Sequence, residues 1–202
     1  KVREKVRVGE VAITRSEYYE NEECVMMQCL DDRIGCMIII DSILRDVKNT
    51  NDMYYVFTVQ EEIGCFGGQT STFDLQPDLF VTFDVACTGD ELRGIRTDVK
   101  LGGGAGIKAM DYFMIVNQYV VDALVDIAEK NGIKYQIEVS EHGGTDAHTA
   151  QFVRGGIKAG AVIIPTRNIH SRDEIICKED ILDCIRMAMA LETVELDEHF
   201  GA

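Results

Sequence analysis

The chain has 202 residues, of which 46% are hydrophobic, and this is enough for one domain with a substantial core. Its formal net charge is −15, so we expect neither nucleic acid nor an anionic membrane as a partner. No apolar run approaches the roughly 20 residues that cross a bilayer. The stretch 1–9 is polar and basic and lacks the apolar centre of a secretion signal. Seven scattered cysteines without a C-x-x-C pair favour free thiols in a reducing cytosol, so a soluble cytoplasmic protein is expected.

Hydrophobic periodicity predicts helices that alternate with strands, which is typical of an α/β fold. We expect a mixed, mostly parallel sheet with helices on both faces. The predicted elements, in chain order, are a helix at 33–47, strands at 53–59 and 78–85, a helix at 117–131, a strand at 134–139, a short helix at 146–153, a strand at 159–164 that Pro165 ends, and a helix at 178–191. A glycine-rich loop at 101–106 and a loop at 166–175 connect some of these elements.

The beginning of the chain has a different pattern. Apolar residues between Val2 and Ile13 suggest short strands, and an acidic, turn-like stretch follows at 17–23. A strand-rich segment that opens directly into an α/β pattern resembles the tail of another module.

Acidic and histidine side chains stand near the ends of the predicted strands, where open α/β sheets place ligand sites. They are Asp31 with Asp32, Glu61 with Glu62, Asp84, and His170. Each has an ordinary explanation by itself: a helix cap, a solvated loop, or a loop histidine. Asp84 is harder to explain in this way, because a carboxylate inside an apolar strand needs a partner or a metal ion.

Taken together, these residue types suit divalent metal ions. Zinc, cobalt and manganese accept carboxylate oxygens and imidazole nitrogens, and a pair of ions about 3.5–4 Å apart needs a bridging carboxylate. Of two adjacent acids, such as Glu61 and Glu62, one can bind metal while the other takes a proton from the attacking water. The cysteines beside these motifs, Cys36 and Cys65, are interpreted as small buried residues.

Four motifs resemble the glutamyl aminopeptidase family, the tetrahedral aminopeptidases that are also labelled cellulase M or endoglucanase. They are LDDRIGC at 30–36, FTVQEEIG at 57–64, GGTDA at 143–147 and PTRNIHS at 165–171. The resemblance runs from about Val8 to the end of the final helix. It implies a zinc-exopeptidase-like fold, with 1–23 as the remnant of an inserted β-rich domain and 24–202 as an incomplete catalytic domain.

The resemblance also implies roles for individual residues. Asp31 matches the acid that bridges two metal ions, and Glu61 matches the general base. The remaining implied metal ligands are Glu62, Asp84 and His170. Substrate contacts are expected from Gly103 and Gly104 in the glycine-rich loop, from Asp146 and from Arg167. For Asp146, roles in ordering the site or in capping a helix remain open.

One implied ligand is absent from the sequence. The family has a further histidine in a His-x-Asp motif, and none of His142, His148 and His199 matches it. We therefore expect two divalent ions, zinc or cobalt, with weak or single occupancy in this chain. Peptides are the expected substrates, and members of the family form homo-oligomers, a state left open here.

Two other functions remain as alternatives. The first is a non-catalytic protein that keeps the fold. The second is glycoside hydrolysis, against which stands the lack of any tryptophan for a sugar platform.

Overall fold

The computed structural model describes residues 2–92, 94–196 and 200. Within that part of the chain, seven strands form one sheet. Its elements in chain order are β1 (Tyr19–Glu20), β2 (Cys24–Met27), α1 (Leu30–Arg45), α2 (Phe66–Leu75), β3 (Leu79–Cys87), β4 (Ala105–Met110), α3 (Gln118–Lys130), β5 (Tyr135–Val139), α4 (Asp146–Ala150), β6 (Lys158–Arg167), β7 (Glu174–Cys177) and α5 (Lys178–Thr193). No helix among the described residues has both the length and the apolar character needed to cross a bilayer.

The sheet is organised around β6, which pairs with three other strands. On one edge, β3 runs parallel to it from Leu79 opposite Lys158 to Cys87 opposite Thr166. On the other edge, β4 and β7 pair with it antiparallel, one after the other along its length. Strand β5 is parallel to β4, and the antiparallel strands β2 and β1 continue the sheet beyond β7. The expected mixed α/β fold is confirmed, with parallel pairing confined to β3–β6 and β4–β5.

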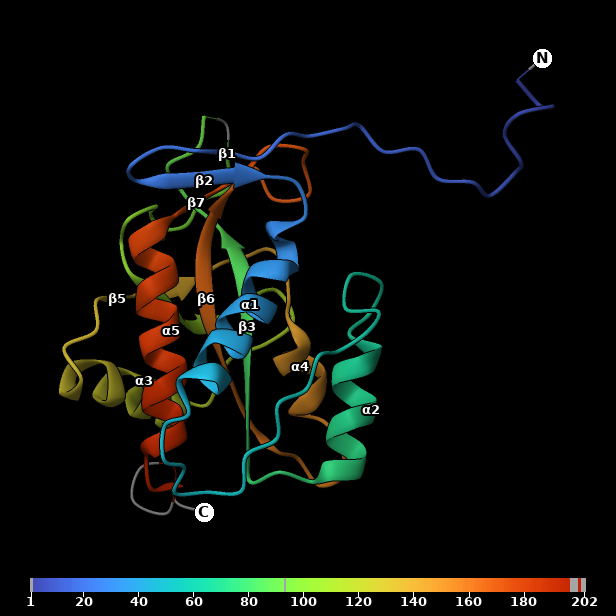
Figure 1. Cartoon of the computed structure of the whole chain (residues 1–202). Coiled ribbons are helices and arrows are strands. Elements are labelled where there is room, and N and C mark those ends of the chain that lie inside the picture. Colours follow the sequence, from blue (N-terminus) through green and yellow to red (C-terminus); the bar gives the residue numbers. More distant parts are fainter. Residues whose placement is uncertain (1, 93, 197–199, 201–202) are drawn as a thin grey trace.

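Helices α1 and α5 pack against each other and lie in front of the central strands in Figure 1, whereas α2 and α4 form a second pair of touching helices. The core between these layers consists of aliphatic side chains. Ile38 of α1, Val162 and Ile164 of β6 and Leu124 of α3 are almost completely buried in it. Apolar burial of this kind stabilises a fold by about 25 cal/mol per Å².

Most of the predicted helices and strands occur close to their expected positions. The helix predicted at 117–131 is α3, whose first turn is capped by the side chain of Asn117, which accepts the backbone N–H of Tyr119 at 3.0 Å. The elements predicted at 33–47, 78–85, 134–139, 146–153 and 178–191 correspond to α1, β3, β5, α4 and α5.

The strand predicted at 53–59 is wrong. The segment has no regular secondary structure and is only partly buried, with Phe57 and Val59 46% and 68% exposed. Its β-branched and aromatic residues favour a strand, but a strand forms only where another strand pairs with it. Among the described residues, no strand pairs with this segment or with the free edge of β3.

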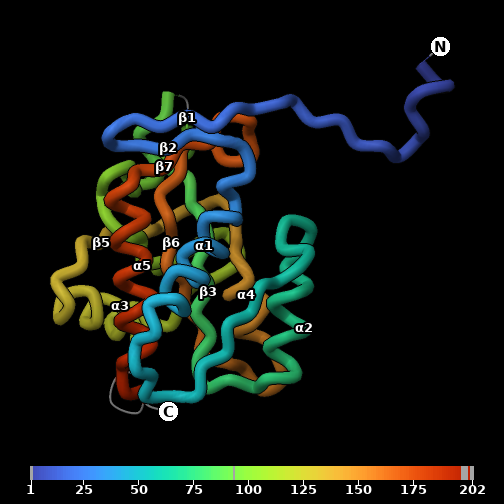
Figure 2. The backbone as a smooth tube through the Cα atoms, viewed as in Figure 1, coloured from blue at the N-terminus to red at the C-terminus, as the bar shows by residue number. Residues whose placement is uncertain are grey.

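The other corrections have similar causes. No strand forms between residues 2 and 13, whose valines are exposed; Figure 2 shows this stretch extending away from the body. Strand β6 continues through Pro165 to Arg167. Pro165 lies between the residues that pair with β4 and those that pair with β7, where the strand edge has room for a residue without an N–H.

Candidate metal centre

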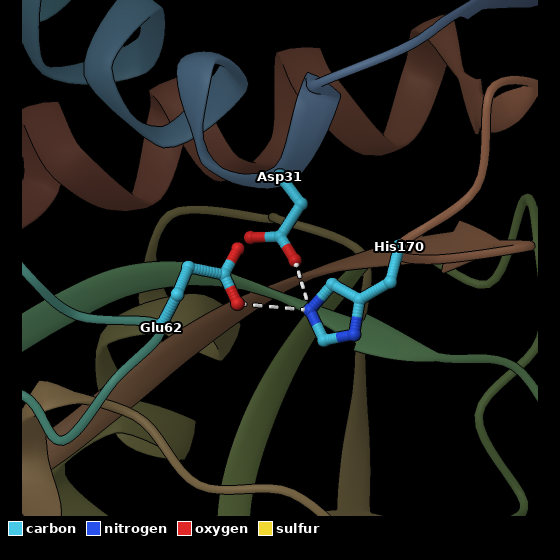
Figure 3. Close-up of side chains that lie close together, drawn as sticks. All are labelled: Asp31, Glu62 and His170. Atoms are coloured by element: carbon cyan, nitrogen blue, oxygen red, sulfur yellow. Dashed lines mark ion pairs between the residues drawn. The ribbon is translucent and has the colours of Figure 1, made fainter. Parts of the chain in front are cut away.

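Three side chains from distant parts of the sequence meet at one end of the sheet. Asp31 is at the start of α1, Glu62 lies in the loop between α1 and α2, and His170 lies in the loop between β6 and β7. The Nε2 atom of His170 is 3.0 Å from Oδ2 of Asp31 and 3.1 Å from Oε2 of Glu62, as Figure 3 shows. Sequence analysis predicted four metal ligands, Asp31, Glu62, Asp84 and His170. Candidate ligand atoms of Asp31, Glu62 and His170 all lie within 4.8 Å of one another, and Asp84 is not in this group.

The exposure of these side chains leaves the cluster open on one side. His170 and Glu62 have side chains that are 67% and 55% exposed, whereas that of Asp31 is only 9% exposed. The buried position of Asp31, and then the negative charge of Glu62, raise the pKa of Asp31 to about 6. A cation at this place would neutralise that repulsion.

A buried glutamate binds the backbone of two of these three residues. One carboxylate oxygen of Glu174 accepts the backbone N–H groups of Leu30 at 2.6 Å and of Asp31 at 3.1 Å. Its other oxygen accepts the N–H of His170 at 2.9 Å. Glu174 is only 2% exposed, so the surrounding structure fixes its side chain. The spacing between Asp31 and His170 is therefore set by a residue outside the cluster.

More acids lie deeper than the cluster. Asp84 at the end of β3 is 6% exposed, and burial raises its pKa well above the ordinary value, with a further contribution from Asp32. Burial also raises the pKa of Asp32 to about 8, although Asp32 accepts the backbone N–H of Gly35 at 3.0 Å. Asp31 and Asp32 are joined by a cis peptide bond. Several carboxylates that repel one another in a buried place are a cation-binding arrangement by their chemistry.

Glu61 lies between the cluster and another buried acid. Its side chain accepts a hydrogen bond from the thiol of Cys65 at 3.3 Å, and burial raises its pKa. The charge of Asp146 contributes to that rise. Burial and the charges of Glu61 and Asp146 in turn raise the pKa of Cys65, which is 4% exposed. Cys65 thus fits the small buried role expected for it, with the added function of holding Glu61.

A cavity of 670 Å³ opens beside these acids. Its lining includes four acids, Glu61, Glu62, Asp84 and Asp146, together with the segment that contains Tyr55. Residues of β3 from Leu79 to Asp84 also line it. The cavity is large enough for a small organic ligand, because ligand pockets commonly measure about 300–1,000 Å³.

The glycine-rich loop is fixed by the first turn of α5. Asp180 accepts the backbone N–H groups of Gly102 at 2.7 Å and of Gly104 at 2.8 Å, and the ammonium group of Lys134 donates to the carbonyl of Gly102 at 2.6 Å. A side chain at position 103 would collide with Gln136. The loop that carries Gly103 and Gly104 is therefore rigid, and its role in substrate binding stays a prediction.

Arg167 already has a protein partner. Its guanidinium group donates to both carboxylate oxygens of Asp90, at 3.2 and 2.5 Å. The Arg167 hydrogen bonds lower the pKa of Asp90 to about 2. A contact between Arg167 and a substrate would have to share or replace this ion pair.

The remaining histidines are elsewhere or outside the described residues. The Nδ1 atom of His148 donates a hydrogen bond to the Thr145 carbonyl at 2.8 Å, and its ring stacks on Phe113. His142 is exposed, and His199 lies outside the described residues.

Sequence reasoning missed Glu174 and Asp180, which hold the site without belonging to its motifs. Glu174 stands four residues after His170 in a stretch that was taken for a loop, so nothing in its local pattern indicated burial. Asp180 is in the first turn of a predicted helix, where an acid has an ordinary explanation in the helix dipole. Both acids are recognisable by their almost complete burial and by their hydrogen bonds to backbone N–H groups. Only the fold reveals these two properties.

Comparisons with known proteins agree with the fold and the motifs. The sequence model of the M42 glutamyl aminopeptidases matches residues 1–187. A relative from Acetivibrio thermocellus is 36% identical over 182 residues, which are 90% of this chain and 55% of that protein. The solved structure of an aminopeptidase from the archaeon Desulfurococcus kamchatkensis superimposes with a TM-score of 0.87 at 33% identity, covering 95% of this chain and 55% of the other.

A second solved structure is that of the TET1 peptidase from Pyrococcus horikoshii, described as able to assemble into a tetrahedron or a large octahedral shell. It superimposes with a TM-score of 0.83 at 30% identity and covers 95% of this chain and 57% of that protein. The chain thus spans slightly more than half the length of the proteins that it matches.

Proposed function

The chain belongs to the M42 glutamyl aminopeptidase family, and we propose that it carries the larger part of the active site of a metal-dependent aminopeptidase. The observation that supports this most directly is the meeting of Asp31, Glu62 and His170, of which Glu62 also lines an acid-containing cavity. Peptides with a free N-terminus are the proposed substrates, and the preferred N-terminal residue is not part of the proposal.

The donor set fits a divalent ion. Two carboxylates and an imidazole nitrogen are ligands that zinc and cobalt accept, and catalytic zinc sites commonly use three protein ligands with one position left for water. A bound ion would lower the pKa of its water from 15.7 toward ~7 and polarise the peptide carbonyl. Asp31 and Asp84 would hold a second ion with only two protein ligands, so we propose weak or single occupancy in this chain.

Glu61 is the proposed general base. Its neighbour Glu62 belongs to the cluster, and the Cys65 thiol holds the Glu61 carboxylate at the cavity wall. In this position Glu61 would take a proton from the attacking water and return it to the leaving amine. Glu174 and the backbone that it binds would keep Asp31 and His170 in place during these steps.

The cavity offers a place for the substrate beside Glu61. Asp146, buried at the cavity wall, would bind a polar group of the substrate or order the site. Gly103 and Gly104, in the glycine-rich loop, and Arg167, at the end of β6, are proposed to contact the substrate. Closure of such a site would exclude water and strengthen these polar contacts.

Three further properties are proposed on weaker grounds. Self-assembly follows from the shells that the TET1 peptidase is described to form. A cytoplasmic location is consistent with free thiols at all seven cysteines. Residues 1–23 are proposed as the remnant of a separate β-rich domain and residues 24–202 as the catalytic domain; β1 at Tyr19–Glu20 pairs with the main sheet, so the boundary would lie within that sheet.

Calorimetric titration with zinc and with cobalt tests the metal site. We expect one tight site in the parent chain, and its loss in Asp31→Asn and His170→Ala. Two equally tight sites would refute the single-occupancy proposal, and absence of any binding would refute the metal centre.

A release assay with aminoacyl anilides tests the reaction itself, separately from metal affinity. Metal-dependent release of the aniline supports the peptidase. Tight metal binding without release, in every form of the protein assayed, would instead support the non-catalytic alternative. Release of sugar from cellulose oligomers without peptidase activity would support glycoside hydrolysis.

A further inference from the structure

We propose that Cys24 and Cys177 form a thiol pair that small-molecule disulfides oxidise to an intramolecular disulfide. Both thiols are free in this structure. The two residues lie directly opposite each other where β2 pairs antiparallel with β7. They are 153 positions apart in the sequence (177 − 24), so only the fold brings them together.

The backbone hydrogen bonding beside Cys24 and Cys177 shows whether they form a hydrogen-bonded or a non-hydrogen-bonded pair of the ladder. The backbone N–H of Lys178 donates to the carbonyl of Glu23 at 2.8 Å, so the bond joins the residue after Cys177 to the residue before Cys24. In an antiparallel ladder such a bond flanks a non-hydrogen-bonded pair. The backbone N–H and C=O groups of the two paired residues then point away from each other. Such non-hydrogen-bonded pairs have Cα atoms about 4.5 Å apart, and their side chains are on the same face.

That spacing suits a disulfide. Bridged cysteines usually have Cα atoms about 4.4–6.8 Å apart, so this pair can close without a shift of either strand. The nearness of the two thiols also affects their ionisation, because burial and then Cys177 raise the pKa of Cys24. Cys87, by comparison, faces Thr166 across the β3–β6 ladder and has no cysteine opposite.

Access to reagents separates this pair from the buried cysteines. Cys24 and Cys177 are both partly exposed, whereas Cys65 and Cys184 are buried. Strands β2 and β7 lie with β1 at one end of the molecule in Figure 1, away from the middle of the core. A small disulfide can therefore reach either thiol by rotation of a side chain at the surface.

The position of Cys177 gives the bond a structural consequence. Cys177 is the residue before α5 and stands midway between Glu174, which holds Asp31 and His170, and Asp180, which holds the glycine-rich loop. A bond from Cys177 to β2 would fasten the segment that carries both of these carboxylates. The bond would also close a long loop in the unfolded chain and so lower the entropy of the unfolded state. This raises the melting temperature by roughly 5–15 °C.

The reaction with oxidised glutathione proceeds in two exchanges. One cysteine thiolate attacks a sulfur of oxidised glutathione, forms a mixed disulfide and releases one glutathione thiol. The second thiolate attacks the protein sulfur of that mixed disulfide, forms the Cys24–Cys177 bond and releases the second glutathione thiol. Two protein thiols lose their hydrogens, and one glutathione disulfide is reduced to two thiols.

The test is redox titration of the chain in glutathione mixtures at about pH 8, because alkaline pH increases the thiolate fraction, with a chelator present so that metal binding has no influence. Remaining thiols are alkylated, and proteolytic peptides are analysed by mass spectrometry. We expect a linked peptide pair that contains Cys24 and Cys177, a higher melting temperature, and reversal of both by dithiothreitol.

Variants make the result decisive. Cys24→Ser and Cys177→Ser should each abolish the linked peptide and the thermal shift, whereas Cys87→Ser should leave both unchanged. Separate glutathione adducts on Cys24 and Cys177, or linkage of either one mainly to another cysteine, would overturn the proposal. Because the test is made without metal ions, its failure leaves the proposed peptidase function untouched.

Discussion

The side chain of Glu174 accepts the backbone N–H of Asp31 at 3.1 Å, although 143 positions separate them in the sequence. Through its other oxygen, the same carboxylate accepts the N–H of His170 at 2.9 Å. One buried side chain therefore sets the distance between two proposed metal ligands. A carboxylate suits this task because three N–H donors converge on it and it carries no donor of its own.

Glu174→Gln should weaken metal binding. The amide offers one oxygen in place of two, and its NH₂ group would face an N–H donor, so Asp31 or His170 would lose its support. Substitution of such outer partners typically lowers metal affinity about 10–100-fold. Calorimetry with zinc measures the affinity, and thermal unfolding measures stability.

Glu192→Gln is the matched control. Glu192 is also 2% exposed, but its side chain interacts with Tyr55 and does not belong to the cluster of Asp31, Glu62 and His170. Its substitution should lower the melting temperature without a change in zinc affinity. If both variants lose stability and neither loses affinity, Glu174 has only a structural role.

Glu61→Gln should separate chemistry from metal binding. Glutamine cannot take a proton from water, so turnover of aminoacyl anilides should fall by about 10²–10⁴-fold while zinc affinity remains. Glu62→Gln provides the contrast, since it removes a proposed ligand and should reduce zinc affinity as well. Unchanged turnover in Glu61→Gln would remove this residue from the mechanism.

Lys108→Met should destabilise the fold strongly. The ammonium group of Lys108 lies 2.7 Å from Glu138 and 3.1 Å from Asp111, and all three side chains are at most 4% exposed. Loss of the only cation of this trio leaves buried carboxylates uncompensated, which typically costs about 3–5 kcal/mol of unfolding free energy.

Lys130→Met is the surface counterpart of that substitution. Lys130 is 2.6 Å from Asp126, but both side chains are about half exposed, and such pairs contribute about 0–1 kcal/mol. Urea denaturation of both variants checks the contrast. Equal and small losses in the two variants would contradict the strong contribution expected from Lys108.

The ion pair of Asp90 with Arg167 should give an acid-dependent contribution to stability. The pKa of Asp90 is lowered to about 2 in the folded chain, against about 3.9 in an unfolded one. A lowered carboxylate pKa stabilises the fold above the unfolded value, and this stabilisation is lost as the pH falls from about 4 to about 2.

Urea denaturation of the parent chain and of Asp90→Asn measures this contribution. The difference should be about 1 kcal/mol or less, since the pair is partly exposed, and it should be constant above about pH 5 and shrink below about pH 4. When Asp90→Asn is made in a chain that already carries Arg167→Gln, the difference in stability should have no such pH dependence. A difference that grows on acidification would contradict the assignment.

Local sequence was sufficient to predict the elements whose own residues favour one secondary structure throughout. Helix α3 has an apolar stripe, a capping asparagine and a glycine after its last turn, and β3 is mostly apolar. The motifs likewise named Asp31, Glu62 and His170, which lie together in the fold, because the order of the motifs along the chain is typical of the family that they resemble.

Elements that depend on tertiary partners could not be predicted. The segment at 53–59 has the composition of a strand and lacks a strand to pair with. Conversely, α2 contains glycines, threonines and a serine and has little helix propensity, yet Ser71 and Thr72 bond back to carbonyls of the preceding turn. The roles of Glu174 and Asp180 depend on backbone N–H groups that, apart from that of His170, the fold brings to them from 76 to 144 positions away.

The central position of β6 also has a consequence for synthesis on the ribosome. Strand β3 ends at Cys87, and its only described partner begins at Lys158, 71 positions later (158 − 87). At about 5–20 residues per second, the nascent β3 would wait ~4–14 s before its partner is made. During that interval its apolar side chains have no sheet to join, so we expect the half-made chain, more than the finished one, to need the protection of chaperones.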